Sequence, residues 1–270
     1  MTATASPATR PEPKDLAIAL DKVWVTFKTT RERKKPSLAR TLQGMRDPAK
    51  RSVWVEALRG VTLDIQRGSV YGVIGHNGAG KTTLFRAIAG ILPPSHGRIT
   101  VWGRVTPLLS LGVGFNRDLT GRENILLGGL TFGLSADEVQ AHFHEVEAFA
   151  GLGQAIDFPM RTYSSGMFSR LAFSVAAHLQ PEILLVDEAL AAGDAAFKVK
   201  SMDKIVELCS RDCTVLIVSH GLEVVKSLAD RCVWLEQGRV RMEAPADQVV
   251  TEFLTRQRVD RSNVVALEDV

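Results

Sequence analysis

The sequence predicts an α/β fold with a parallel sheet at its centre. Two near-continuous apolar runs, Ile183-Leu-Leu-Val186 and Val215-Leu-Ile-Val218, are typical of strands buried on both faces. Helical patterns follow each of them, from about Ala195 to Ser210 and from Leu222 to Ala229. A third apolar run, Val70 to Ile74, opens into a glycine-rich loop. This alternation of strands and helices indicates crossover connections between parallel strands.

Composition and length bound the possible classes of protein. The chain has 270 residues, of which 45% are apolar, which suffices for a full core. It holds no run of about 18 uncharged apolar residues, and its N-terminus is rich in Thr, Ala and Pro, so we expect neither a membrane span nor a signal peptide. Cys209, Cys213 and Cys232 are too few and too scattered for a disulfide framework, and we expect reduced thiols in the cytoplasm.

The N-terminal part is predicted to be an antiparallel β portion behind a disordered tail, residues 1–14. Leu16 to Phe27 and Val61 to Ile65 have the composition of strands. Arg98 to Val105 is predicted to be a strand pair bent at Gly103.

A basic insert, residues 28–52, separates the first two of these strands. From Lys28 to Arg51 it has a net charge of +7, although the whole chain has only +3. Leu38, Leu42 and Met45 recur there at helical spacing. Either a short amphipathic basic helix contacts a membrane surface or an anionic substrate, or the insert is a solvated loop; the sequence favours neither.

A helical subdomain is predicted over residues 116–180, ended by Pro181. Ser135-Ala-Asp-Glu138 is a capping-box pattern ahead of a helix from Ala136 to about Ala150. After the last apolar run, a hairpin is predicted to turn at Gln237-Gly238, followed by a helix from Ala246 to about Arg256 and a tail over residues 259–270.

The glycine-rich loop has the spacing of a phosphate-binding P-loop. Its residues are Gly75, His76, Asn77, Gly78, Ala79, Gly80, Lys81, Thr82 and Thr83. Glycines let backbone N–H groups approach phosphate oxygens, and the following helix directs its positive end at the anion. We expect Lys81 to neutralise the β and γ phosphates of ATP and the Thr82 hydroxyl to bind Mg²⁺.

Acidic residues follow the next buried strand. Asp187, at the end of Ile183 to Val186, is expected to hold Mg²⁺ through water beside Thr82. The adjacent Glu188 would lie near the γ phosphate and act as a general base on the attacking water.

Three further motifs occur in a characteristic order. Tyr163-Ser164-Ser165-Gly166-Met167 precedes a helix, and a helix N-terminus of this composition is a potential anion site. Ala191-Ala-Gly-Asp194 follows Glu188, and Val218-Ser219-His220 ends the next strand. Each motif alone also fits an ordinary cap or loop.

Together with the P-loop, these motifs resemble those of the ABC ATPases, over roughly residues 16 to 250. Ser164 and Gly166 match the signature motif, Asp194 the D-loop and His220 the switch histidine. The resemblance implies a P-loop NTPase fold with a RecA-like core over residues 15–258. It also implies a head-to-tail homodimer in which Ser164, Ser165 and Gly166 of one copy complete the ATP site of the other.

Within this family, the chain resembles ATP-binding subunits of polysaccharide exporters. The shared features are the block from Leu109 to Asn124, Tyr163 to Met167 and the basic insert. This implies a peripheral protein on the cytoplasmic face of the inner membrane, near the membrane surface, with an integral membrane permease that moves a lipid-linked glycan. Where most members have the Q-loop glutamine, this chain has Phe115-Asn116. We expect no added C-terminal glycan-binding domain.

An aromatic side chain should stack on adenine. Trp54, before the strand that leads into the P-loop, is the first candidate and Phe27 the alternative; core packing of either side chain is a competing interpretation. Two other functions are weighed against polysaccharide export: transport of a drug or lipid without glycan, and a soluble ABC ATPase acting on nucleic acid or the ribosome. The latter usually has paired ATPase domains or long coiled coils, and this chain has neither, so we expect no nucleic-acid partner.

Overall fold

The computed structural model describes residues 15–30, 52–108, 112, 114–187, 194–210, 212–219 and 221–268. Several predicted features lie outside these ranges. They are the N-terminal tail, the candidate helix of the basic insert with Leu38, Leu42 and Met45, Glu188 with Ala191 to Gly193, and His220.

The N-terminal β portion is a three-stranded antiparallel sheet in the order β2-β1-β4. Its strands are β1 (Leu16–Thr30), β2 (Ser52–Gln66) and β4 (His96–Val101). The prediction of a short strand at Val61 to Ile65 covered only part of β2. Register shifts along the β1–β2 pair break the alternation of polar and apolar residues, which is why the pattern did not show the full strand.

The central sheet has six strands in the order β5-β6-β7-β3-β8-β9. The strands are β3 (Val70–Ile74), β5 (Val105–Pro107), β6 (Ile183–Val186), β7 (Thr214–Val218), β8 (Arg231–Glu236) and β9 (Arg239–Pro245). All pairs are parallel except β8–β9, which is the predicted hairpin. Every residue of β3, β6 and β7 is buried, as their apolar runs predicted.

The prediction of a strand pair bent at Gly103 was wrong. β4 and β5 belong to different sheets, and Gly103 lies in the connection between them. Gly103 has a φ of +139°, which L side chains rarely adopt, and a Cβ there would lie 2.9 Å from Glu182 Oε2 and push that carboxylate aside. The sequences of β4 and β5, on either side of this glycine, do not indicate to which sheet each strand belongs.

The two faces of the central sheet are covered by different layers. In β3, Tyr71 and Val73 face a core shared with the N-terminal sheet and α2 (Lys81–Ile88). Val70 faces the opposite side, where the core includes residues of α5 (Ser165–His178) and α6 (Ala195–Cys209). The P-loop therefore lies where β3 leaves a core packed on both faces.

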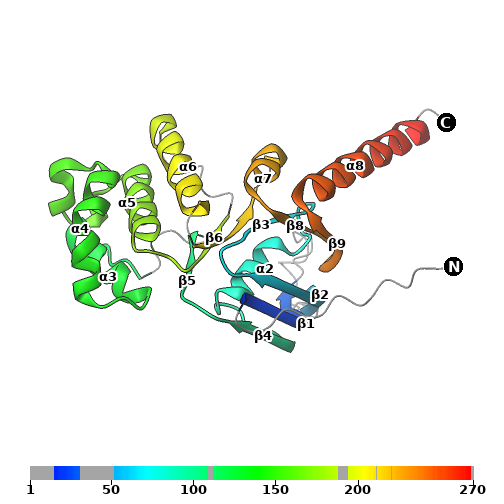
Figure 1. Cartoon of the computed structure of the whole chain (residues 1–270), viewed down its shortest axis with the longest axis horizontal. Helices are drawn as coiled ribbons and strands as arrows, with labels where there is room; N and C mark the ends of the chain where they lie inside the picture. Colours follow the sequence, from blue (N-terminus) through cyan, green and yellow to red (C-terminus); the bar gives the residue numbers. More distant parts are fainter. Residues whose placement is uncertain are drawn as a thin grey trace, which may run out of the picture.

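The helices within residues 116–180 have a core of their own. They are α3 (Gly121–Thr131), α4 (Ala136–Ala150), two 3₁₀ turns (Gly153–Asp157 and Met160–Thr162) and α5. The predicted capping box of α4 is present, since Ser135 Oγ accepts from Glu138 N and Glu138 reaches back to Ser135 N. Figure 1 shows α3 and α4 at one end of the molecule, away from the N-terminal sheet.

The C-terminal helices are α7 (Leu222–Leu228) and α8 (Ala246–Glu268). The prediction that the last helix ends near Arg256 was wrong, because α8 continues and extends outward from the body (Figure 1). Among the α8 residues up to Arg258, the last buried one is Phe253, so in this range the buried apolar face that predicts a helix stops close to the predicted end. No helix in the described part of the chain is both long and apolar enough to cross a membrane.

Candidate functional site

The P-loop connects the end of β3 to the first turn of α2. Gly80, the residue before α2, has a φ of +107°, and a Cβ there would lie 2.6 Å from the carbonyl oxygen of Ala57. Gly78 has a φ of +80°, and a Cβ there would meet no atom of the described part of the chain within 4 Å. Gly80 is therefore required by close backbone contact. Gly78 leaves the loop open to an approaching phosphate.

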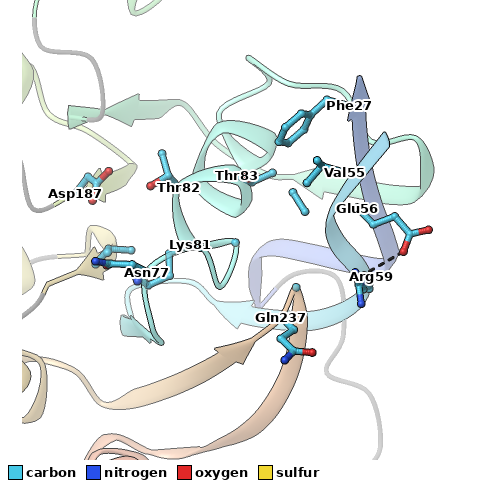
Figure 2. A pocket seen from close by; sticks show the side chains of 15 residues that line it. Phe27, Val55, Glu56, Arg59, Asn77, Lys81, Thr82, Thr83, Asp187 and Gln237 are labelled. Carbon is cyan, nitrogen blue, oxygen red and sulfur yellow. Dashed lines mark ion pairs between the residues drawn. The ribbon is translucent and has the colours of Figure 1, made fainter. Parts of the chain in front are cut away.

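Three parts of the chain that are far apart in sequence line one cavity of about 720 Å³ (Figure 2). Its walls come from the P-loop and α2, from β1 and β2, and from the ends of β6, β7 and β8. The lining residues are Phe27, Val55, Glu56, Ala57, Arg59, Asn77, Gly78, Gly80, Lys81, Thr82, Thr83, Asp187, Val218, Gln237 and Gly238. The cavity has the volume of a typical small-molecule site.

The Lys81 side chain folds back over the P-loop. Its Nζ donates to the carbonyl oxygen of Gly75 at 2.7 Å and to that of His76 at 3.1 Å. These bonds hold the ammonium beside the loop, where it can meet an anion bound by the backbone N–H groups. The His76 ring packs 5.2 Å from the Phe253 ring, and Ala79 is buried, so neither of these side chains faces the cavity as Lys81 does.

Thr82 and Asp187 meet at one end of the cavity. Thr82 lies in the first turn of α2 and Asp187 directly follows β6. Figure 2 shows the Thr82 hydroxyl facing the Asp187 carboxylate. Both groups are oxygen donors of the kind that Mg²⁺ prefers, and the ion usually takes its remaining ligands from water and substrate phosphates. The described residues contain no cluster of three or more His, Cys, Asp or Glu able to hold a metal without such help.

The two candidates for the adenine platform lie in different positions. Phe27 lines the cavity, whereas Trp54 does not and is 66% exposed. Phe27 pairs with Val55 across the β1–β2 hairpin, and both line the cavity. Because successive strand residues point to opposite faces, Trp54 is directed away from the face that carries Val55. The sequence could not distinguish the two aromatics without the register of the hairpin.

The β8–β9 turn is a part of the cavity that sequence reasoning missed. Gly238 N donates to the Ala79 carbonyl oxygen at 2.9 Å, and Arg59 N donates to the Gly238 carbonyl oxygen at 2.7 Å. The turn thus joins the P-loop to β2. The Gln237-Gly238 pair signalled a hairpin turn in the sequence, but nothing in it indicated that the turn would reach the P-loop.

The candidate signature residues do not line this cavity. Ser164 caps α5 by accepting from Met167 N at 3.2 Å, and Ser165 and Gly166 lie in the first turn of that helix. Asp194 caps α6, where its Oδ1 accepts from Phe197 N at 2.8 Å. A single chain therefore brings together the P-loop, Thr82, Asp187 and Phe27, and leaves the α5 N-terminus and Asp194 elsewhere on its surface.

Phe115 and Asn116, which stand where most ABC ATPases have the Q-loop glutamine, make local structural contacts. Phe115 packs edge-on against Phe168, with ring centroids 5.8 Å apart. Asn116 Oδ1 accepts from Asp118 N at 3.0 Å, and Asn116 N donates to Asn124 Oδ1 at 2.8 Å. Neither lines the cavity, so neither supplies there the amide that a glutamine would provide.

This α/β core carries a P-loop, and two oxygen donors and an aromatic side chain line the same cavity. Such an arrangement is typical of ATPases that bind nucleotide. The model of the ABC transporter family matches residues 58–191. The O-antigen export ATP-binding protein RfbB of Klebsiella pneumoniae is 41% identical over 194 residues, covering 72% of this chain and 79% of that protein. The chain belongs to the ABC transporter family as an ATP-binding protein.

Two further relatives and a solved structure agree with this assignment. RfbB of Myxococcus xanthus is 43% identical over 81% of this chain, and the teichoic acids export protein TagH of Shouchella clausii is 41% identical over 73% of it. The matched chain spans only 50% and 54% of these two relatives. The dimeric ATP-binding cassette MJ0796, solved with ADP and Pi, has a TM-score of 0.65 at 22% identity, covering 85% of this chain and 98% of that one, which shows the shared fold.

Proposed function

We propose that this chain is the ATP-binding and ATP-hydrolysing subunit of an ABC exporter that moves lipid-linked polysaccharide across the membrane. The observation that carries the ATPase part is the single cavity in which the P-loop, Thr82, Asp187 and Phe27 converge. The export part is supported by the relatives, whose names specify O-antigen export and teichoic acids export.

The chemistry proposed is attack of water on the γ phosphorus, which releases ADP and inorganic phosphate. Lys81 would bind phosphate oxygens from beside the loop, and Thr82 and Asp187 would hold Mg²⁺, which when bound offsets charge on the β and γ phosphates. Glu188 would take the proton of the attacking water, and His220 would contact the γ phosphate. The roles of these last two residues come from the family resemblance.

We further propose that two copies pair head to tail. The helix N-terminus at Ser164 to Gly166 lies outside the cavity of its own chain, so it is available to another copy. In such a pair, the P-loop of one copy and this helix end of the other would enclose each ATP. Two composite sites per homodimer would result.

The transport partner proposed is a separate integral membrane permease, with this chain bound to it at the cytoplasmic face of the inner membrane. Because ATP would bind the closed dimer preferentially, closure would shift the permease between inward- and outward-facing states. The glycan would be contacted by the permease, and no nucleic acid takes part.

Depletion of this chain in its host, with the surface glycan measured, tests the proposed function. We expect loss of the glycan from the surface and its accumulation as a lipid-linked form inside, together with co-purification of an integral membrane protein. An intact glycan coat with a co-purified membrane protein would contradict glycan export and favour a drug or lipid cargo. Absence of any membrane partner would contradict transport itself.

The basic insert gives a separate prediction. Neutralising Arg33, Lys34, Lys35 and Arg40 with glutamine should reduce glycan export more than ATP hydrolysis, if the insert contacts the membrane surface or an anionic substrate. The control is the same substitution at Arg256 and Arg258, which are exposed on α8. Unchanged export in the insert variant would show that the insert is a solvated loop.

A further inference from the structure

The Arg170 side chain of α5, which is 27% exposed, contacts two other elements, the end of α4 and the start of α6. Its Nε donates to the Ala150 carbonyl oxygen at 3.0 Å and its Nη2 to the Gly151 carbonyl oxygen at 3.2 Å, both at the end of α4. Its Nη1 lies 3.5 Å from Asp194 Oδ2, at the start of α6. Each nitrogen of the guanidinium therefore has its own partner, which the fixed fork of arginine allows and the single ammonium of lysine does not.

The surroundings leave this side chain little freedom. The guanidinium carbon lies 5.2 Å from the centroid of the Phe197 ring, in the first turn of α6. A Cβ on Gly151 would lie 2.8 Å from Arg170 Nη2, so only glycine lets the arginine approach the end of α4 so closely. The neighbouring Lys200 of α6 donates to the Phe149 carbonyl oxygen at 3.1 Å, which gives α4 a second tie to α6. Carbonyls at a helix C-terminus favour such cations.

Asp194 divides its two carboxylate oxygens between two tasks. Oδ1 caps α6 by accepting from Phe197 N, and Oδ2 faces Arg170. The hydrogen bond of Oδ1 holds the Asp194 side chain at the start of α6, and Oδ2 forms an ion pair with Arg170 of α5. Arg170 therefore connects the N-terminal part of α5 to Asp194. It lies less than two helical turns from Ser164.

We propose that Arg170 is a positioning residue for the composite ATP site. It would hold the Ser164 to Gly166 helix end and Asp194 at a fixed separation, so that both meet the second copy together. This inference rests on the proposed homodimer. Arg170 itself does not line the cavity of its own chain, so its loss should leave ATP binding by the isolated P-loop intact and weaken the step that closes the dimer.

The test measures ATP-driven dimerisation by light scattering in a Glu188→Gln background, in which ATP is bound without turnover. We expect Arg170→Met to raise the dimer dissociation constant about tenfold and Arg170→Lys to raise it less, in line with couplings between contacting residues. Asp194→Asn keeps a good helix cap and removes the charge that faces Arg170, so it should raise this constant about threefold. The Arg170→Met/Asp194→Asn double variant should be no worse than Arg170→Met alone.

Matched controls separate positioning from general damage. Arg122→Met removes another arginine of the helical subdomain, one that pairs with Glu147 and Asp157 and does not reach α6. It should leave dimerisation unchanged. ATP binding to dilute monomer should be equal in Arg170→Met and its parent.

The two proposals fail in different ways. A Glu188→Gln parent that stays monomeric with saturating ATP would overturn the homodimer. If the parent dimerises and the Arg170 variants dimerise equally well, the role of Arg170 is overturned while the homodimer stands. The same holds if the effects of the Arg170 and Asp194 substitutions on the dimer dissociation constant simply add. If Arg170→Met does not fold, Arg170→Lys and Asp194→Asn decide the same question.

Discussion

We propose that Phe27 is the side chain that stacks on the adenine base. It lines the cavity, whereas Trp54 does not line it and is 66% exposed. Phe27→Ala should raise the dissociation constant for ATP about fivefold, the size of a typical stacking contribution. Trp54→Ala, the matched control, should change it less than about twofold. Titration of both variants with a fluorescent ATP analogue compares them, and the reverse order would restore Trp54 as the platform.

His178 makes folding stability depend on pH. Burial lowers the pKa of its imidazole, and the nearby Lys204 adds to this, while a hydrogen bond to the Ser174 carbonyl oxygen and the carboxylates of Glu145 and Glu207 oppose it. Because the pKa is lower in the folded protein, the unfolded chain binds a proton first as the pH falls. The contribution of His178 to stability is thus fully present above the ordinary histidine pKa of 6.5 and is lost below it.

Thermal unfolding at several pH values tests this effect. Between pH 7.5 and 5.5, the unfolding temperature of the parent should fall more than that of His178→Gln, which cannot be protonated. His144→Gln is the control, because the His144 side chain is 90% exposed. Parallel curves for the parent and His178→Gln would contradict the effect of burial.

At the scale of elements, the β8–β9 turn fastens the P-loop to β2. Gly238 has a φ of +79°, and a Cβ there would lie 2.6 Å from the Ala57 carbonyl oxygen. Gly238→Ala should therefore destabilise the protein by about 1–3 kcal/mol and weaken ATP binding, since the turn must move from the P-loop. Gly68→Ala is the matched control. Gly68 has a φ of +70°, but a Cβ there would meet no atom of the described residues within 4 Å.

Gly68→Ala should show only the cost of the left-handed backbone, with ATP affinity unchanged. Denaturant unfolding and ATP titration of the two variants give both comparisons. Equal ATP affinities in the two variants would mean that the turn does not position the P-loop.

Elements with a strong local signal could be predicted from the sequence. β6 and β7 were predicted from continuous apolar runs, α4 from its capping box, and the start of α2 from the P-loop spacing. The full lengths of β2 and α8 could not. Register shifts break the alternation of polar and apolar residues in β2, and among the α8 residues up to Arg258 the last buried one is Phe253.

At the scale of the whole molecule, the sequence predicted which motifs occur but not how they meet. Thr82 and Asp187 were expected together, and both line the cavity. The choice between Phe27 and Trp54 depends on the pairing of β1 with β2, and the role of Gly238 depends on contacts between strands far apart in the chain. Such contacts follow from topology and close packing, which leave no mark on the residue pattern.

We propose that the P-loop cavity is half of an ATP site and that a second copy of the chain supplies the rest. Gly166 allows a clean test, because among the described residues of its own chain a Cβ there would meet only Ser164 Oγ, at 3.8 Å. A side chain at this position should therefore be tolerated by the fold while obstructing a partner.

The decisive measurement is the molar mass of the Glu188→Gln variant with and without MgATP. We expect MgATP to double the mass, and the additional Gly166→Asp substitution to return the protein to a monomer that still binds ATP through its own P-loop. A Glu188→Gln variant that stays monomeric while saturated with ATP would contradict the composite site, as would a Gly166→Asp form that dimerises equally well.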